Sequence, residues 1–340
     1  MSTSDASSKS ALFSAIYIEN AARDYPATRA VLEKYPELPR IPVRRYRDVF
    51  NRPRQNLLWQ KDHRALILAV KEPPFLYPGP EVCQDFGADK FFYTSFLLGC
   101  PFRCDYCYLQ GMYPSSYVTA FVNLEDFKSA IDDELARAPG EQLYLALSYD
   151  TDLIAFDPVF PYLEELYPFF AAKKNLTAEL RTKSANAAFF ARYPASGPLV
   201  AAFSLAPDEV IRRTEKYTPS LDARLRTIRA AQDAGYSVRL CFDPVFVGAE
   251  YDDLYEPFFE TVFSRIDPEM VSAVSHGFFR MNRTFFRRIR KERPDSPLYL
   301  NDFPKSEDIV TYDEELAGAV RESHLTILSR YIPKERIFIV

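Results

Sequence analysis

Three cysteines crowded into eight residues are the group in this sequence best suited to chemistry. Cys100, Cys104 and Cys107 are separated by three and then two residues. Thiolates at this spacing can wrap a loop around one face of an iron–sulfur cubane, and they leave its fourth iron without a protein ligand. The spacing therefore predicts a [4Fe–4S] cluster with one iron open to a small molecule.

Two other interpretations fit these cysteines less well. A structural zinc site needs a fourth Cys or His, and His63 and His276 are remote in the sequence, although folding could bring either near. Buried core thiols are the second alternative, but three of the five cysteines gather at the end of one strand-like segment. The odd number of cysteines also argues against a disulfide framework and favours a metal site in a reducing cytoplasm.

The cysteine loop follows the first of six strand-like segments that alternate with helical ones. Strands are expected at 91–98, 143–148, 176–181, 199–205, 238–242 and 271–275. Helices are expected at 124–138, 159–173, 185–192, 221–234 and 254–266. This alternation favours a parallel sheet with right-handed crossovers, whose strand C-terminal ends carry the chemistry if the sheet curls. We predict an α/β fold, a partial (β/α)6 TIM-type barrel with N- and C-terminal extensions.

The predicted barrel occupies only the middle of the chain. We expect a lead-in at 1–85, a core at 86–280 and a C-terminal extension at 281–340. Residues up to about 40 are expected to be helical and loosely attached, with a strand-like run at 65–70 further along. The extension lacks the strand–helix rhythm and is expected to pack outside the barrel.

Charge limits the class of partner. The net charge of −5 and the pI near 5.5 argue against a generally basic nucleic-acid coat, so a polyanion must meet a local basic patch. Such a patch is predicted in the C-terminal extension, where Arg283, Arg287 and Arg290 would share one helix face while Phe286 and Ile289 pack inward. This face suits a DNA phosphate backbone, and it is equally consistent with a solvated helix face.

Membrane association is not expected. No stretch of about 18 uninterrupted apolar residues occurs in the chain. The first twelve residues are polar and small and lack the charged start and apolar run of a signal peptide. We therefore expect a cytoplasmic protein with no membrane partner.

The cysteine loop matches the signature of the radical S-adenosylmethionine superfamily, in which an aromatic residue, here Tyr106, precedes the third cysteine. In that superfamily the open iron binds S-adenosylmethionine, which an electron from the cluster cleaves to methionine and a 5′-deoxyadenosyl radical. More closely, the segments 99–110 and 117–123 resemble the spore photoproduct lyase family. Those DNA-repair enzymes reverse the thymine dimer 5-thyminyl-5,6-dihydrothymine. The resemblance runs from about 65 to 260 and includes 181–183, 203–204, 217–222, 233–236 and 243–244.

The resemblance implies a role for each matching residue. The three cysteines would ligate the cluster, and Tyr106 would lie against the adenine of S-adenosylmethionine. Lys183 and Ser204 would contact its carboxylate and ribose, with Asp243 also on the cofactor-binding surface. Tyr108 would join the hydrogen-atom relay that regenerates the cofactor. Without these roles, Lys183 would be a solvated strand-end charge and Ser204 a packed small residue. UV-damaged DNA and an external one-electron donor such as flavodoxin or ferredoxin are the implied partners.

The chain departs from the family at the hydrogen donor to the product radical. The family has a cysteine after the second strand, where this chain has Tyr149, or Ser148 if a gap is allowed. A serine O–H bond is too strong to donate a hydrogen atom easily, whereas a tyrosine O–H is a plausible donor. Cys241 is the other candidate, because strand alternation puts it on the same side as Asp243, although deeper; otherwise it is a buried structural thiol. Cys83 is assigned no role.

Three functional hypotheses follow. The first is a lyase for the thymine photoproduct, with Tyr149 or Cys241 replacing the usual donor. The second is a radical enzyme of the same lineage that acts on another substrate, since the family's C-terminal substrate loop is not recognisable. The third is a non-catalytic iron–sulfur or DNA-binding protein. An open iron argues against the third, because binding alone does not need one.

Overall fold

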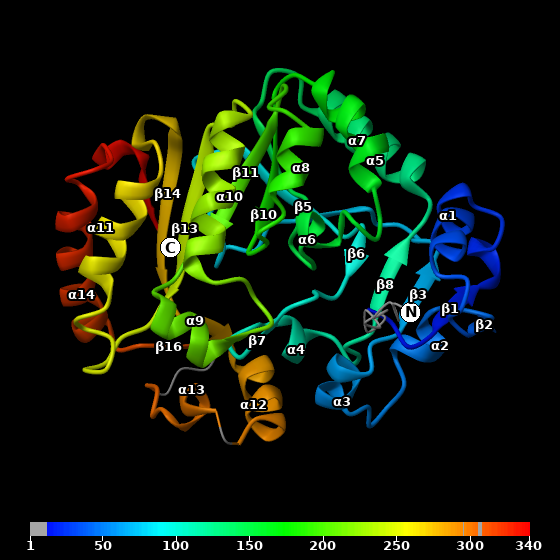
Figure 1. Cartoon of the computed structure of the whole chain (residues 1–340), viewed down its shortest axis with the longest axis horizontal. Helices are drawn as coiled ribbons and strands as arrows, with labels where there is room; N and C mark the ends of the chain where they lie inside the picture. Colours follow the sequence, from blue (N-terminus) through cyan, green and yellow to red (C-terminus); the bar gives the residue numbers. More distant parts are fainter. Residues whose placement is uncertain (1–11, 295, 305–307) are drawn as a thin grey trace, which may run out of the picture.

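A large curled sheet dominates the part of the chain described by this computed structural model, residues 12–294, 296–304 and 308–340 (Figure 1). Its eight strands follow the spatial order β17 (Ile337–Ile339), β14 (Val271–Phe278), β13 (Val238–Val245), β11 (Leu199–Ser204), β10 (Leu176–Thr182), β9 (Leu143–Ala146), β5 (Lys90–Thr94) and β4 (Leu76–Pro78). The pairs are parallel except β4 with β5. The run from β5 to β14 supplies the six predicted strands and confirms the partial barrel.

Helices between the strands cover the outer face of the barrel (Figure 1). The main ones are α5 (Leu124–Arg137), α7 (Tyr162–Ala171), α8 (Ala187–Arg192), α10 (Leu221–Asp233) and α11 (Tyr255–Arg265), each within three residues of its predicted bounds. In α10, the Ser220 side chain accepts a hydrogen bond from the Ala223 amide at the start. Past its end, Gly235 takes a left-handed φ of 89°, which lets the chain turn back toward β13.

Strand alternation divides the side chains of β10 between helices and barrel interior. Ala178 and Leu180 are buried on one side, whereas Glu179 and Arg181 point to the other and line an interior cavity. The barrel therefore presents charged side chains inward near the C-terminal ends of its strands.

The described part of the N-terminal lead-in differs from the prediction. It contributes to a second, five-stranded sheet in the order β2 (Arg40–Val43), β1 (Ile16–Glu19), β3 (Leu66–Ala69), β8 (Val118–Phe121) and β6 (Leu97–Leu98). Ile16 is fully buried, so the expectation of a loosely attached lead-in is wrong for residues 12–40. The expected helix is present there as α1 (Pro26–Lys34), but β1 precedes it. Four-residue strands are too short to show a period of two clearly.

The predicted strand at 91–98 is two strands. Residues 90–94 form β5 of the barrel, and after Ser95 and Phe96 the chain enters β6 of the second sheet. The Ser95 hydroxyl donates to the buried carboxylate of Asp150 at this break. The cysteine loop that follows therefore begins where the two sheets meet.

The prediction for the C-terminal extension is partly correct. Helix α12 (Arg283–Glu292) forms with Phe286 and Ile289 buried, and it packs on α4 (Leu109–Met112) just after the cysteine loop. A Cβ atom at Gly111 would lie 2.4 Å from the Cβ of Phe285, so this contact requires glycine. The last strand, β17, extends the barrel sheet beside β14, so the prediction that the extension lies outside the barrel is wrong for β17.

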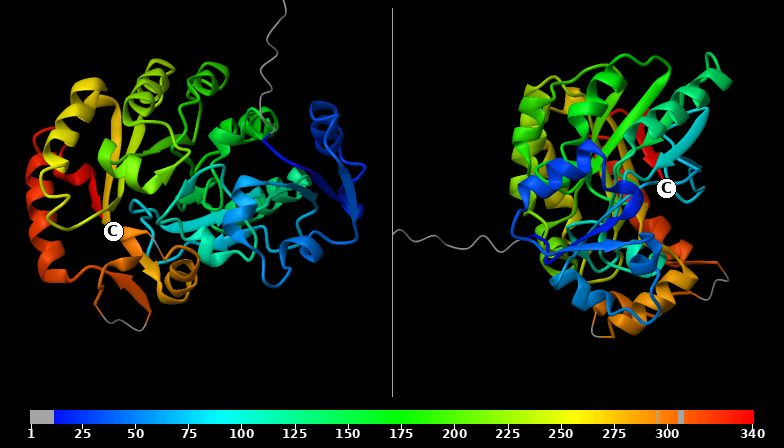
Figure 2. Two further views of the ribbon diagram at one scale, coloured as in Figure 1. Left: turned by 60° about the horizontal axis from the view of Figure 1, so that its bottom comes forward. Right: turned by 90° about the vertical axis from the view of Figure 1, so that its right-hand side faces the viewer.

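Different secondary-structure elements form the two ends of the molecule. Strands β1 and β2 lie at one end, and α11 with α14 (Glu314–Leu328) lies at the other (Figures 1 and 2). Because the five-stranded sheet includes β6 and β8 from beyond residue 85, the three-part division at residues 85 and 280 stays a prediction.

Across the described ranges, no helix combines the length and the apolar character that crossing a bilayer requires.

A buried histidine pair joins α14 to the barrel. His276 of β14 and His324 of α14 share a hydrogen bond of 3.0 Å between Nε2 and Nδ1. Burial lowers the pKa of His276 to about 3, helped by His324, and burial lowers the pKa of His324 to about 4. Both imidazoles are therefore neutral at pH 7.

Acidification should destabilise the fold through this pair. The unfolded chain takes up both protons near the ordinary pKa, and the folded chain does so only near the lowered values. The stabilisation is therefore complete above about pH 6.5 and lost as the pH falls toward 4, with a slope of up to about 2.7 kcal/mol per pH unit for two protons. We therefore expect the free energy of unfolding, measured with urea at pH 7, 6 and 5, to change less steeply with pH in His324→Phe than in the wild type. Equal slopes in the two proteins would contradict this account.

Candidate active site

One cavity of about 640 Å³ lies at the C-terminal ends of the barrel strands and reaches the cysteine loop. It brings together nine of the residues singled out in the sequence: Cys100, Cys104, Tyr106, Cys107, Tyr108, Tyr149, Lys183, Ser204 and Asp243. The strands converge there, because Ser204 ends β11, Lys183 follows β10 and Tyr149 follows β9.

Four of the candidate residues do not line this cavity: Cys241, Arg283, Arg287 and Arg290. Cys241 is fully buried, two residues before Asp243 on β13, and it pairs across the sheet with Ser275 of β14. Arg287 and Arg290 are exposed on α12 and Arg283 is half-buried. The structure thus separates Cys241 from the space where a substrate could lie.

Backbone pairing fixes the cysteine loop. Strand β7 (Arg103–Cys104) pairs antiparallel with β12 (Glu215–Lys216), which sets Cys104 opposite Glu215. The Asp105 amide donates to the Thr214 carbonyl at 2.7 Å, and the Gln110 side chain donates to the Cys104 carbonyl at 2.7 Å. The loop is therefore held from both sides before any cofactor binds.

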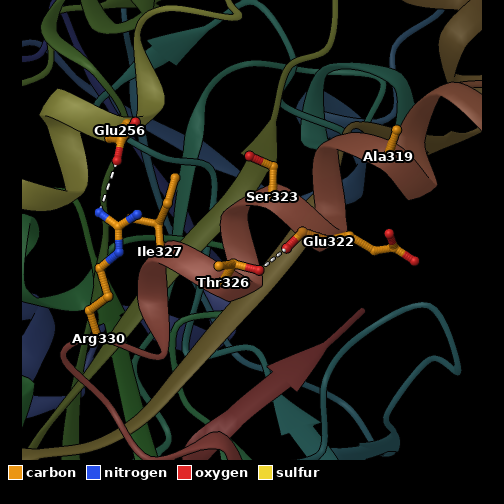
Figure 3. A pocket seen from close by; sticks show the side chains of 7 residues that line it. All are labelled: Glu256, Ala319, Glu322, Ser323, Thr326, Ile327 and Arg330. Carbon is orange, nitrogen blue, oxygen red and sulfur yellow. Dashed lines mark hydrogen bonds and ion pairs between the residues drawn. The ribbon is translucent and has the colours of Figure 1, made fainter.

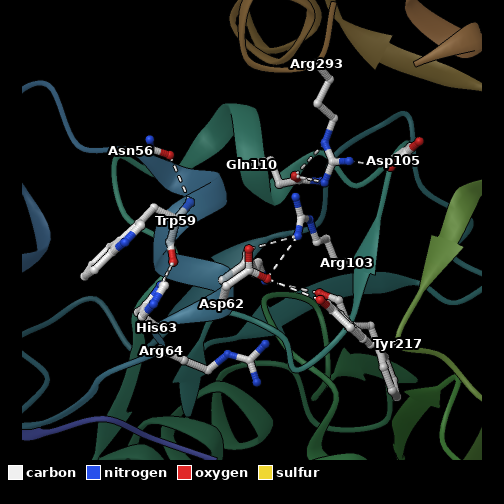
Figure 4. Close-up of polar contacts among 12 residues, drawn as sticks. Asn56, Trp59, Asp62, His63, Arg64, Arg103, Asp105, Gln110, Tyr217 and Arg293 are labelled. Atoms are coloured by element: carbon white, nitrogen blue, oxygen red, sulfur yellow. Dashed lines mark hydrogen bonds and ion pairs between the residues drawn. The ribbon is translucent and has the colours of Figure 1, made fainter. Parts of the chain in front are cut away.

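Basic side chains bind the carbonyl oxygens of the same loop. Lys61 donates from Nζ to the carbonyls of Cys100 (2.9 Å) and Phe102 (3.2 Å), and Arg64 donates to the Pro101 carbonyl at 2.9 Å. From another side, Arg293 pairs with the buried carboxylate of Asp105 (Figure 4). Positive charge around the loop favours thiolates and an anionic cluster.

The three cysteines fit an iron–sulfur cluster better than a single metal ion. Burial raises the pKa of the Cys100 thiol to about 12 and that of Cys104 well above its usual value. Such thiols become stable thiolates only beside a metal cation. In the described ranges, no three Cys, His, Asp or Glu side chains gather closely enough to hold one metal ion. Cys100, Cys104 and Cys107 could instead hold the wider face of a cubane.

A buried network joins the predicted cofactor-binding residues. The Tyr106 hydroxyl donates to the Glu215 carboxylate, and the Lys183 ammonium lies 5.5 Å from the centroid of the Tyr106 ring. Glu215 also forms a buried ion pair with Arg224, which donates to the Ser204 carbonyl at 3.0 Å. Although burial opposes ionisation, Arg224 and Lys183 hold the pKa of Glu215 below its usual value.

Sequence reasoning missed Glu215 and Arg224. A weak signal for Arg224 existed, because it follows Leu221 by three residues and so falls on the apolar stripe of α10 with Leu225 and Ile228. Glu215 gave no signal, since its role depends on pairing with Cys104 more than a hundred residues earlier.

The end of β10 is positioned by Asp152. Its carboxylate accepts hydrogen bonds from the Thr182 hydroxyl at 2.8 Å and from the Lys183 amide at 2.8 Å, and it also caps α6 (Leu153–Phe156). Burial raises its pKa despite these hydrogen bonds. Asp152 thus fixes the backbone of Lys183 and leaves its ammonium group to face the cavity.

Aromatic rings and a thiol form a second group of side chains that line the cavity. The Tyr149 ring stacks on Tyr93 at a centroid distance of 4.1 Å and lies 5.5 Å from the Tyr108 ring. The Tyr108 hydroxyl donates to the Tyr149 carbonyl at 2.6 Å. Cys83 also lines the cavity, and the Tyr149 side chain lies near enough to its thiol to affect the thiol's pKa.

Cys83 was assigned no role in the sequence analysis. It lies in the loop between β4 and β5, which has no periodic pattern to indicate where a side chain points. Arg280 fixes this loop: it pairs with Asp243 through two contacts of 3.0 and 3.1 Å and donates to the Val82 carbonyl at 2.9 Å. Asp243, expected to face the cofactor, is therefore also an anchor for the Cys83 loop.

A second depression lies on the outer surface between α11 and α14 (Figure 3). Its lining includes the exposed ion pair of Arg330 with Glu256 at 2.9 Å, and no cysteine or histidine. It lacks the groups that the chemistry considered above requires.

Comparison with known proteins agrees with this geometry. The family model described as spore photoproduct lyase matches residues 12–316. Spore photoproduct lyase of Bacillus subtilis is 23% identical over 344 residues, covering 95% of this chain and 96% of that protein. The enzyme of Clostridium acetobutylicum is 20% identical over 343 residues, covering 96% and 98%.

Solved structures show the same fold. Spore photoproduct lyase complexed with dinucleoside spore photoproduct superposes with a TM-score of 0.81 at 18% identity, covering 96% of this chain and 98% of that one. A double variant of that enzyme with bound AdoMet and dinucleoside spore photoproduct gives a TM-score of 0.80 at 19% identity, with the same coverage. Because the family model spans residues 12–316 of 340, this chain belongs to the spore photoproduct lyase family and thereby to the radical S-adenosylmethionine superfamily.

Proposed function

We propose that this chain repairs the spore photoproduct, 5-thyminyl-5,6-dihydrothymine, in UV-damaged DNA. The observation that carries the proposal is one cavity that brings together three cysteines, a cofactor-binding wall and a thiol–tyrosine wall. Cys100, Cys104 and Cys107 would hold a [4Fe–4S] cluster, which when bound would supply the electron for cleavage of S-adenosylmethionine to methionine and a 5′-deoxyadenosyl radical. The relatives with bound dinucleoside spore photoproduct support this choice of substrate.

The cofactor-binding wall would orient S-adenosylmethionine. The Lys183 ammonium pairs with its carboxylate, and the Ser204 hydroxyl bonds its ribose. The Tyr106 ring lies against the adenine, held in position by the hydrogen bond from its hydroxyl to Glu215. Asp243 completes this surface while it anchors Arg280.

Cys83 would be the hydrogen-atom donor to the product radical, in place of the two candidates from the sequence. A hydrogen atom moves from the Cys83 thiol to the thymine carbon radical and leaves a sulfur radical. Tyr149 gives its hydroxyl hydrogen atom to the sulfur, and Tyr108 gives its own to the Tyr149 radical. The Tyr108 radical then takes a hydrogen atom from 5′-deoxyadenosine, which restores the 5′-deoxyadenosyl radical. Burial raises the pKa of the Cys83 thiol and of both tyrosines, so all three carry the hydrogen at neutral pH. Cys241 is fully buried and outside the cavity, which argues against it as donor.

The test is an anaerobic assay of the reduced, reconstituted protein with S-adenosylmethionine and a dinucleotide carrying the photoproduct. Mass spectrometry should detect repaired thymine together with 5′-deoxyadenosine. Deoxyadenosine without repair would favour a radical enzyme of the same lineage with another substrate. Failure to form either product would favour a binding protein.

Cys83→Ala should uncouple the two products. We expect 5′-deoxyadenosine still to form while the yield of repaired thymine falls at least about tenfold. This fall corresponds to an activation barrier about 1.4 kcal/mol higher. The matched control is Cys241→Ala, which should leave the yield unchanged. A Cys83→Ala protein with full yield would transfer the donor role to Tyr149.

DNA would lie against α12. The cavity lining includes Asn282 and Phe285, so this helix borders the mouth through which a thymine pair extruded from the stack must enter. Arg287 and Arg290 are exposed beside it, and Arg283 is half-buried on the same helix. Their positive charge suits the phosphates that flank the lesion.

Replacing Arg287 and Arg290 with Gln should weaken duplex binding without changing dinucleotide repair. Losing two phosphate contacts should reduce the slope of log affinity against log salt by about 1.8. Fluorescence anisotropy with a duplex oligonucleotide measures this slope. The control replaces Arg226 and Arg229 with Gln, two exposed arginines with the same spacing on α10. Equal slopes in the two double variants would exclude α12 as the phosphate-binding helix.

The reaction also requires a reducing environment. A cluster on cysteine thiolates and an external one-electron donor of the flavodoxin or ferredoxin class are both suited to the cytoplasm. We therefore propose the cytoplasm as the compartment in which this protein acts.

A further inference from the structure

Two large aromatic side chains project into solvent beside the cysteine loop. Trp59, the single tryptophan of the chain, is 51% exposed, and Tyr217 is 64% exposed. Trp59 stacks on His63 with ring centroids 4.3 Å apart. Tyr217 has a positive φ of 67°, an uncommon conformation for a bulky residue. Exposed aromatic side chains held in defined orientations are typical of the central residues of protein–protein interfaces.

Asp62 links the elements that carry these aromatic residues. Its carboxylate accepts hydrogen bonds from the Tyr217 hydroxyl at 3.2 Å and from Arg103 at 3.1 Å (Figure 4). Helix α3 (Leu57–Asp62) is thereby joined to the β7–β12 pair. In Figure 4, Trp59 and Tyr217 extend to different sides of Asp62. Together, Trp59, His63 and Tyr217 define what we call the aromatic face.

The segments that carry the aromatic face contact the backbone of the cysteine loop. Lys61, two residues after Trp59, and Arg64, next to His63, bind the carbonyls of residues 100–102. Arg103 adjoins Cys104 directly and pairs through its backbone with Lys216, the neighbour of Tyr217. Trp59, His63 and Tyr217 do not line the substrate cavity. An electron could therefore reach the cluster here without competing with S-adenosylmethionine or substrate.

Basic residues flank the aromatic residues in the sequence, on a chain whose net charge is −5. Lys216 is exposed on β12, and Arg52 and Arg54 are exposed in the loop that leads to α3. Lys61 and Arg64, which bind the loop carbonyls, add two further cations. A local basic surface on an acidic protein attracts an acidic partner and accelerates its encounter.

We infer that the aromatic face is the docking site of an acidic one-electron carrier protein that reduces the cluster. The inference rests on the proposed function, because radical chemistry needs one electron for each cleavage of S-adenosylmethionine. One electron passes from the carrier's reduced centre to the oxidised cluster, and no bond is made or broken. Transient electron-transfer complexes are small, so a few aromatic and basic residues can supply such a surface.

The experiment compares two reductants on the reconstituted protein. Loss of the cluster's visible absorption is followed after mixing with a reduced, tryptophan-free ferredoxin or with dithionite. Trp59→Ala and Tyr217→Ala should each slow reduction by the ferredoxin about tenfold, as expected for removal of a central interface residue. Reduction by dithionite should be unchanged in both variants. Higher salt should slow the ferredoxin reaction in the wild type.

Leu316→Ala provides the matched control, because this leucine is 52% exposed on α14, far from the cysteine loop. Its ferredoxin rate should equal that of the wild type. The fluorescence of Trp59 gives a second readout: it should change when oxidised ferredoxin binds to the wild type.

Two results would overturn the inference. Unchanged ferredoxin rates in both aromatic variants would exclude the face as the docking site. Slowing with both reductants would mean that Trp59 and Tyr217 support the cluster rather than the carrier. A protein that ferredoxin reduces in a Trp59-dependent way, but that repairs no photoproduct, would uphold the docking site and reject the proposed substrate.

Discussion

The pairing of β7 with β12 is the constraint on which the rest of the site depends. It sets Glu215 opposite Cys104, so one acidic residue is tied to the cluster loop through its backbone and to Tyr106 through its carboxylate. A buried carboxylate is tolerated only with a partner, and Arg224 supplies one. Because Arg224 also binds the Ser204 carbonyl, the loop and the fourth strand of the core are held in one hydrogen-bonded unit.

The side chains of Cys83, Tyr108 and Tyr149 have a different proposed task, which is to return a hydrogen atom to the product radical. Tyr149 follows β9, and Cys83, from the loop between β4 and β5, lines the same cavity. Arg280 makes this arrangement possible, since it ties the Cys83 loop to Asp243 of the barrel. In the proposed reaction, the donor thiol therefore comes from the Cys83 loop and not from the segment that follows β9.

The sequence predicted the features that local patterns encode. Six buried strands separated by amphipathic helices specify a parallel sheet, and the spacing of the cysteines specifies a loop around a cluster. It could not predict the second sheet, whose short strands show no clear period, or the break at Ser95. Glu215 and Cys83 were missed for a related reason: the significance of each arises from a contact with a residue far away in the sequence.

The central claim is that Cys100, Cys104 and Cys107 leave one iron open to S-adenosylmethionine. The most direct measurement is electron–nuclear double resonance on the reduced, reconstituted protein with S-adenosylmethionine labelled at its amino nitrogen and carboxylate oxygens. The account predicts that the cluster's electron spin couples to the labelled nuclei, because both groups bind the open iron. An intact cluster without such coupling would contradict the account.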